Sequence, residues 1–96
     1  MILKKHLSGG KLVIAVCDSK LLGKKIEEGN FVLDLVSNFY KGEETTPEKL
    51  LKELNSSFMI NAVGEKSVAV LLDNKIITKK DLKTISGVPY CLVVFD

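Results

Sequence analysis

The 96-residue sequence predicts one small α/β or α+β domain, residues 1–96, with a mixed sheet of about four to five strands, two main helices and an N-terminal hairpin. Apolar residues run without interruption over 12–17 and 91–95, which is typical of strands that are covered on both faces. Residues 45–55 and 64–73 combine apolar residues at helical spacing with helix-start signals. A chain of this length supports a single core.

The N-terminal elements follow from local pattern. Residues 2–7 are expected to form a strand, and Ser8-Gly9-Gly10 is a turn signal that joins it to the apolar strand 12–17. Residues 18–23 predict one helical turn, which Gly23 ends.

The next stretch is more polar. Residues 24–30 predict a loop, and residues 31–36 predict a third strand that Asp34 interrupts. Residues 37–42 predict an exposed turn.

The first helix has clear start and stop signals. Thr45 and Glu48 fit a capping box, Pro47 lies in the first turn, and the helix is expected to end near Asn55. A short strand is expected over 58–62.

The second helix is expected over 64–73, with an apolar face wide enough for deep burial. Residues 76–77 predict a brief extended piece. Thr78 and Asp81 fit another capping box, which predicts a short helix over 79–83. The last strand is expected over 90–95, after Gly87-Val88-Pro89.

Composition limits the class of protein. With 46% apolar and 27% charged residues the chain is expected to be globular, and no apolar run approaches the length of a membrane helix. The N-terminus lacks the pattern of a secretory signal. Cys17 and Cys91 both lie in apolar runs, which indicates buried free thiols in a reducing cytoplasm.

Charge is unevenly distributed although the net charge is only +2. Residues 1–25 hold six lysines against one acid, residues 26–65 hold eight acids against three lysines, and residues 66–96 hold five lysines against three acids. The chain has no arginine, the side chain that most often binds phosphate in a bidentate manner. Lysines alone can still attract a polyanion as point charges.

No catalytic residue, metal ligand or cofactor site is predicted. The stretch Gly64-Glu65-Lys66-Ser67 lacks the first glycine of a phosphate-binding P-loop and inserts an acid. His6 is the only histidine, so a thiol–histidine pair is limited to His6 with Cys17, and the ligands for zinc are too few. These absences favour a non-enzyme but leave activity open.

Several short motifs occur in order along nearly the whole chain. Asp18-Ser19-Lys20-Leu21-Leu22-Gly23-Lys24 follows the hairpin, Glu28, Gly29 and Leu33 lead to Phe39-Tyr40 and Gly42, and Asn61, Val63, Gly64 and Glu65 precede Gly87-Val88-Pro89. Their order and spacing resemble the archaeal family catalogued as domain of unknown function 424. The resemblance implies a cytoplasmic archaeal protein of one domain and suggests a connection with RNA or translation. It supplies no catalytic residues.

The first functional hypothesis is a non-enzymatic binding module that contacts RNA or a translation-linked complex. Its candidate residues are lysines and two aromatics that can stack on bases. They are Lys4, Lys5, Lys11, Lys20, Lys24, Lys25, Phe39 and Tyr40. This hypothesis predicts that Lys4, Lys5, Lys24 and Lys25 lie on one face.

The second hypothesis is a small-ligand or anion-binding protein, or an enzyme of unrecognised type. It uses two segments with special backbone residues, which could meet at the ends of the strands. Its candidates are Asn61, Gly64, Glu65, Lys66, Gly87, Pro89 and Tyr90. The third hypothesis is a protein–protein adaptor or homodimer that pairs through the apolar edge of the sheet.

Overall fold

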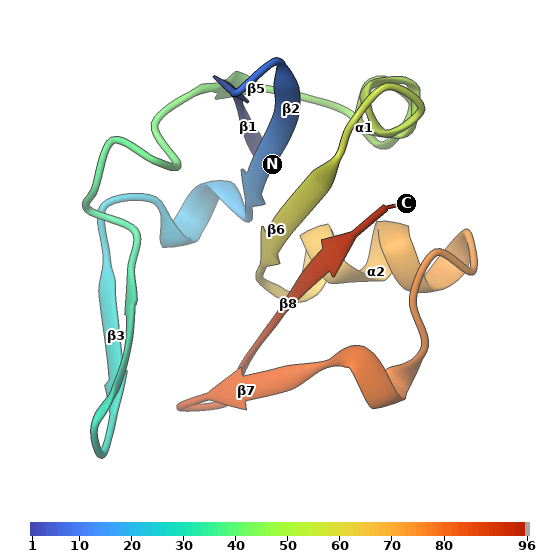
Figure 1. Ribbon diagram of the computed structural model, residues 1–96. Coiled ribbons are helices and arrows are strands. Elements are labelled where there is room, and N and C mark those ends of the chain that lie inside the picture. Colours follow the sequence, from blue (N-terminus) through green and yellow to red (C-terminus); the bar gives the residue numbers. More distant parts are fainter. Residues whose placement is uncertain (96) are drawn as a thin grey trace.

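Strand β2 (Lys11–Cys17) lies inside the main sheet of the computed structural model, which describes residues 1–95 (Figure 1). It pairs antiparallel with β1 (Ile2–Ser8) and parallel with β6 (Met59–Val63). The hairpin turn between β1 and β2 is Gly9-Gly10, where both residues have positive φ, as a type I′ turn requires. The predicted N-terminal hairpin is therefore confirmed.

The main sheet has six strands, more than the four to five that the sequence predicts, and its order is β5-β1-β2-β6-β8-β7. All neighbouring pairs except β2–β6 are antiparallel. The remaining strands of this sheet are β5 (Glu43–Glu44), β7 (Lys83–Ile85) and β8 (Val88–Val94). The protein is thus a small α+β domain with a mixed sheet.

Two helices cover one face of this sheet, which we call the helix face (Figure 1). They are α1 (Pro47–Leu54) and α2 (Glu65–Asp73). Leu50 of α1 and Leu71 of α2 are fully buried against the strand residues Ile14 and Ile60, which are also fully buried. Alternation along each strand sends every second side chain to this face, where it joins the larger part of the core.

A second layer covers part of the opposite face, which we call the hairpin face. It consists of the two-stranded hairpin of β3 (Lys25–Glu28) and β4 (Phe31–Asp34), which lies away from the helices in Figure 1. Leu35, directly after the hairpin, is buried with Cys17 and Val63 of the main sheet. The prediction of layers on both faces of the sheet is confirmed for this half of it.

The hairpin is anchored at the turn between β7 and β8. The backbone N–H of Ser86 donates to Glu28 Oε1 at 2.6 Å, and the Ser86 hydroxyl donates to the carbonyl oxygen of Glu27 at 2.7 Å. The predicted loop over 24–30 was therefore wrong, because β3 occupies most of it. A short polar strand carries too few apolar residues to show an alternating pattern.

The observed start of each helix lies within one residue of the start that the sequence predicts. The side chain that caps α1 is Thr46, whose Oγ1 accepts from the Lys49 N–H at 3.3 Å, so the predicted box of Thr45 and Glu48 was wrong by one position. The box of Thr78 with Asp81 is confirmed, with the Thr78 N–H donating to Asp81 Oδ2 at 2.8 Å.

The short helical pieces are 3-10 turns. The predicted turn within 18–23 is a 3-10 turn over Ser19–Leu21, and the short helix predicted over 79–83 ends at Asp81. Strand β7 begins after Leu82 and pairs with β8. No helix in residues 1–95 is long and apolar enough to cross a membrane.

We expect Ile60→Ala to lower the free energy of unfolding by about 2–5 kcal/mol, because Ile60 is fully buried between the sheet and both helices. Chemical denaturation measures this loss. Leu92→Ala is the matched control, since Leu92 is 58% exposed on a neighbouring strand and should cost less than about 1 kcal/mol. Equal losses at the two positions would contradict the assigned core.

Candidate functional site

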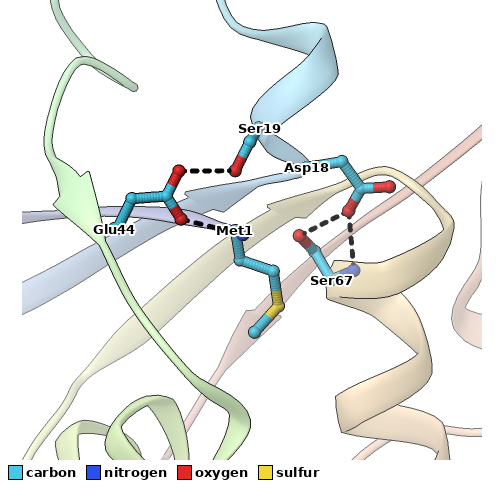
Figure 2. Close-up of polar contacts among 5 residues, drawn as sticks. All are labelled: Met1, Asp18, Ser19, Glu44 and Ser67. Carbon is cyan, nitrogen blue, oxygen red and sulfur yellow. Dashed lines mark hydrogen bonds and ion pairs between the residues drawn. The ribbon is translucent and has the colours of Figure 1, made fainter.

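The carboxylate of Asp18 occupies the N-terminus of α2. Asp18 is 2% exposed and follows β2 directly. Its Oδ1 accepts from the N–H of Ser67 at 2.8 Å and from the Ser67 hydroxyl at 2.9 Å (Figure 2). Its Oδ2 accepts from the Lys66 N–H at 3.1 Å. A negative charge at this end of a helix also complements the helix dipole. Asp18 therefore caps a helix that begins 47 positions later in the chain.

Gly64 makes this contact sterically feasible. It has φ of 107°, and a Cβ built at this position would clash with the carboxyl group of Asp18. The Gly64 N–H donates to the carbonyl oxygen of Pro89 at 2.8 Å, and the Asp18 N–H donates to that of Val63 at 3.0 Å. The ends of β2, β6 and β8 are thereby joined to the start of α2.

This arrangement leaves little of the predicted anion site at the start of α2. The amides of Lys66 and Ser67 are already bonded to a carboxylate, and a second anion beside Asp18 would be repelled. Glu65 is exposed in the first turn, as the structural interpretation of this acid predicts.

The two segments of the second hypothesis do meet. Gly64, Glu65, Gly87 and Pro89 line one shallow cleft of about 110 Å³, together with Asp18 and Lys20. Lys66 is not among the lining residues of this cleft. Asn61 and Tyr90 lie on neighbouring strands of the hairpin face, where Asn61 is opposite Leu92 and Tyr90 is opposite Val63. The cleft is smaller than the usual volume of a small-molecule site, which is about 300–1,000 Å³.

The predicted basic face is not formed. Lys4 and Lys5 are adjacent in β1, so their side chains point to opposite faces of the sheet. Lys5 Nζ lies 3.5 Å from Glu53 Oε1 of α1, and Lys25 Nζ lies 3.9 Å from Glu27 Oε1. The expectation that Lys4, Lys5, Lys24 and Lys25 share one face was therefore wrong.

The other lysines of that set are also separated. The Lys11 ammonium lies 4.3 Å from the centre of the Phe58 ring, and Lys20 and Lys24 are exposed in the connection between β2 and β3. Alternation along a strand could have separated Lys4 from Lys5 from the sequence alone.

Phe39 and Tyr40 are half-buried rather than exposed, because both pack against the hairpin face. The rings of His6 and Phe39 stack with centroids 4.4 Å apart and an angle of 9° between their planes, and His6 Nε2 donates to the Phe39 carbonyl oxygen at 2.8 Å. Tyr40 meets Phe39 edge-on. Burial, and the nearby thiol of Cys17, raise the pKa of the Tyr40 hydroxyl to about 12.

The two thiols are buried in different layers. Cys17 packs under the hairpin and Cys91 packs under the helices, so the two side chains point to opposite faces and both cysteines are free. Burial, with a contribution from Asp18, raises the pKa of the Cys17 thiol to about 11. Burial, with a contribution from Asp81, raises that of Cys91 to about 11.

His6 and Cys17 do not form a thiol–histidine pair. His6 is paired with Val13 whereas Cys17 is paired with Ile2, four residues further along β2. Since a strand rises about 3.3 Å per residue, this separates the two residues by about 13 Å. A thiol with a raised pKa is also a weak nucleophile at neutral pH. Residues 1–95 contain no group of three or more His, Cys, Asp or Glu side chains able to hold a metal ion.

The hairpin covers only one half of its face of the sheet. The other half, which we call the open face, lies on β1, β2, β6 and β8. Its accessible residues are Lys4, His6, Val13, Met59, Asn61, Leu92 and Val94. Leu92 is 58% exposed and Val94 is 48% exposed. The small side chain of Ala15 is buried at the centre of this surface.

Sequence reasoning missed this surface. The last strand is apolar throughout and was expected to be covered on both faces, which is wrong for Leu92 and Val94. Apolar runs of this kind report burial in a sheet but do not report how far the second layer extends.

These features define a small α+β protein in which Asp18 caps α2 at the covered end of the sheet. The open face of the same sheet is largely apolar. The chain belongs to the protein family of unknown function DUF424, whose model matches residues 6–95, as the motifs predict. It is similar to the crystal structure of an uncharacterized conserved protein from Methanopyrus kandleri. The two share 26% identity and a TM-score of 0.80, over 96% of this chain and 88% of that chain. No curated protein matches significantly.

We expect Asp18→Ala to lower the free energy of unfolding by about 2 kcal/mol or more, because it leaves two helix amides and the buried Ser67 hydroxyl without their acceptor. Denaturant unfolding measures the effect. Glu65→Ala, which removes an exposed acid from the same helix turn, should cost no more than about 1 kcal/mol. Comparable losses would show that helix-dipole charge, and not the buried bonds, gives Asp18 its role.

We expect the thiols to make stability fall between about pH 9 and 11. Each thiol has an ordinary pKa of 9.0 and a folded pKa of about 11, so the folded state favours the protonated form. This stabilisation is complete below pH 9 and is lost as the pH rises toward 11. Unfolding free energies measured across this range should fall less steeply in a Cys17→Ala, Cys91→Ala variant. Parallel curves would refute the assignment.

Proposed function

We propose that this protein is a binding module whose open face docks a partner protein that carries apolar and acidic side chains. The observation that carries the proposal is the exposure of Leu92 and Val94, at 58% and 48%, on the part of the hairpin face that the β3–β4 hairpin leaves uncovered. Covering a side chain of this size contributes about 1.5–3 kcal/mol when its burial is complete.

The apolar surface is continuous across three strands. Val13 of β2 is paired with Met59 of β6, which is paired with Val94 of β8, so the three side chains form one row. Leu92 lies in the next row, opposite Asn61. Contiguous apolar surface of this kind marks interaction sites more often than scattered apolar side chains do.

Charge favours an acidic partner. The four strands that carry the open face contain no aspartate or glutamate, whereas Lys4 and His6 lie on the face itself. Two copies placed face to face would gain no ion pair from these strands. A partner with acidic side chains at the rim of its contact would complement Lys4 and would associate faster at low salt.

The surface is also preorganised. Its two central strands, β2 and β6, are paired on both sides, and the fully buried Ile14 and Ile60 pack behind them. A partner would therefore order little of this protein on binding, and less of the interaction free energy would be offset by lost conformational freedom.

RNA is the second candidate occupant, because an acid-free surface with Lys4 beside the His6–Phe39 stack suits a polyanion with flat bases. Three features favour a protein instead. The exposed groups are aliphatic, His6 already covers one side of the Phe39 ring, and the chain contains no arginine. A small ligand in the cleft beside Asp18 has the least support, given its volume of about 110 Å³.

The test places a photo-crosslinking amino acid at position 92 in the native host and identifies what is captured. We expect a protein adduct that resists ribonuclease, and we expect the purified partner to bind with at least tenfold lower affinity to Leu92→Asp with Val94→Asp. Val36→Asp is the control, because Val36 is 60% exposed but lies after β4, outside the open face.

Two outcomes would contradict the proposal. One is an adduct that ribonuclease removes, together with a logarithm of the binding constant that falls linearly with the logarithm of salt concentration. This outcome would show that RNA occupies the open face. An equal loss of binding in Val36→Asp would show that the captured protein does not depend on the open face.

A further inference from the structure

A different surface, the outer edge of β1, is only partly paired. Strand β5 covers this edge at two positions, where Glu44 pairs with Ile2 and Glu43 pairs with Leu3. Beyond Leu3, no strand among residues 1–95 pairs with the edge, which continues through Lys5 and Leu7 to the hairpin turn. Leu7 is 77% exposed, the most exposed large apolar side chain in the described chain.

The register shows which backbone groups this edge presents. A two-residue turn of type I′ makes Ser8 and Lys11 a hydrogen-bonded pair, so the alternate residues of β1 bond to β2. Lys5 and Leu7 are the residues between them, and their N–H and C=O groups point away from β2. The bond from the Thr45 N–H to the Met1 carbonyl oxygen, at 2.9 Å, follows the same outward pattern.

A groove runs beside this edge on the helix face. It has a volume of about 230 Å³ and lies between β1, β5 and α1. Its lining comprises Leu3 and Lys5 from β1, Glu43 and Glu44 from β5, Thr45, and Lys49, Lys52 and Glu53 from α1.

Of the three lysines that line the groove, one forms an ion pair among residues 1–95. Lys5 is 3.5 Å from Glu53, but Lys49 and Lys52 have no ion-pair partner among residues 1–95. They are three positions apart in α1 and therefore lie on the same side of the helix. Both acids of β5 also line the groove: Glu44 is 3.6 Å from the amino group of Met1 and accepts from the Ser19 hydroxyl (Figure 2), whereas Glu43 has no ion-pair partner among residues 1–95.

We propose that the β1 edge and this groove bind an extended, acidic peptide segment of a partner protein. The segment adds as a strand beside Lys5 and Leu7, in line with β5, and directs acidic side chains toward Lys49 and Lys52. Strand addition of this kind takes its affinity from main-chain bonds and its specificity from alternate side chains. This site is separate from the open face, so the inference does not rest on the proposed function.

The chain itself provides the template for this mode. Strand β5 is a two-residue acidic strand, Glu43-Glu44, that already pairs antiparallel with the same edge. A second copy of β1 is a poorer occupant, because it would bring further lysines against Lys5.

The probe is a fluorescein-labelled peptide of six residues that alternates valine and glutamate, and fluorescence anisotropy measures its binding. We expect Leu7→Pro to weaken binding at least tenfold, since proline lacks the outward N–H but leaves the β1–β2 bonds in place. Leu7→Ala, which keeps that N–H, should stay within about twofold of the unaltered protein. Exchanging Lys49 and Lys52 for glutamate should favour a peptide of alternating valine and lysine.

A test on the peptide does not depend on how the variants fold. Two forms of the same valine–glutamate peptide are N-methylated at alternate residues, one at the odd and one at the even positions, so that each form lacks the N–H donors of one edge. The form that lacks the donors facing β1 should bind at least tenfold more weakly than the other. The amides of Lys5 and Leu7 should gain protection from hydrogen exchange when the unmodified peptide binds. Absence of binding at millimolar peptide, equal binding of both methylated forms, or unchanged exchange at these amides would overturn the proposal.

Discussion

The bonds of the Asp18 carboxylate hold together the parts of the chain that define one end of the sheet. The side chain leaves β2, satisfies the first turn of α2 and lies against Gly64, while adjacent backbone bonds attach Val63 and Pro89. A burial this complete is tolerated because every side-chain oxygen has a donor, and no buried side-chain polar atom in residues 1–95 is left unpaired. The cap replaces an acceptor that Gly64, which has no side chain, cannot supply at the start of α2.

That closed end explains where binding surfaces remain. Near Asp18 the sheet is covered on both sides, by the helices and by the β3–β4 hairpin with Leu21 and Leu35. The hairpin is too short to reach the other end, so Leu92 and Val94 stay exposed there, while the outer edge of β1 extends beyond β5. Both candidate surfaces therefore lie at a distance from the rigid cap, on strands that the cap and core hold in place.

Much of the fold could be predicted from the sequence because local signals are strong. The type I′ glycines, Pro47 and the Thr78–Asp81 box each act within a few residues, and the apolar runs identify β2 and β8. Strands β3 and β7 lack such signals, since their pairing depends on a neighbour brought close by the fold. The role of Asp18 was not predictable either, because its partners Lys66 and Ser67 are 48 and 49 positions away. Of the candidate site residues, Gly64 and Pro89 line one cleft, which is a condition of the second hypothesis, whereas Lys4 and Lys5 were wrongly grouped.

The placement of Cys17 and Cys91 has a consequence for how the molecule opens. Each thiol is buried in a different layer, one beneath the hairpin and one beneath the helices. A fluctuation that lifts the hairpin alone would uncover Cys17 and leave Cys91 protected, whereas global unfolding would uncover both. The native chain thus contains two internal reporters of sub-global opening, and their relative reactivities would separate the local stability of the thin hairpin layer from that of the larger helical layer.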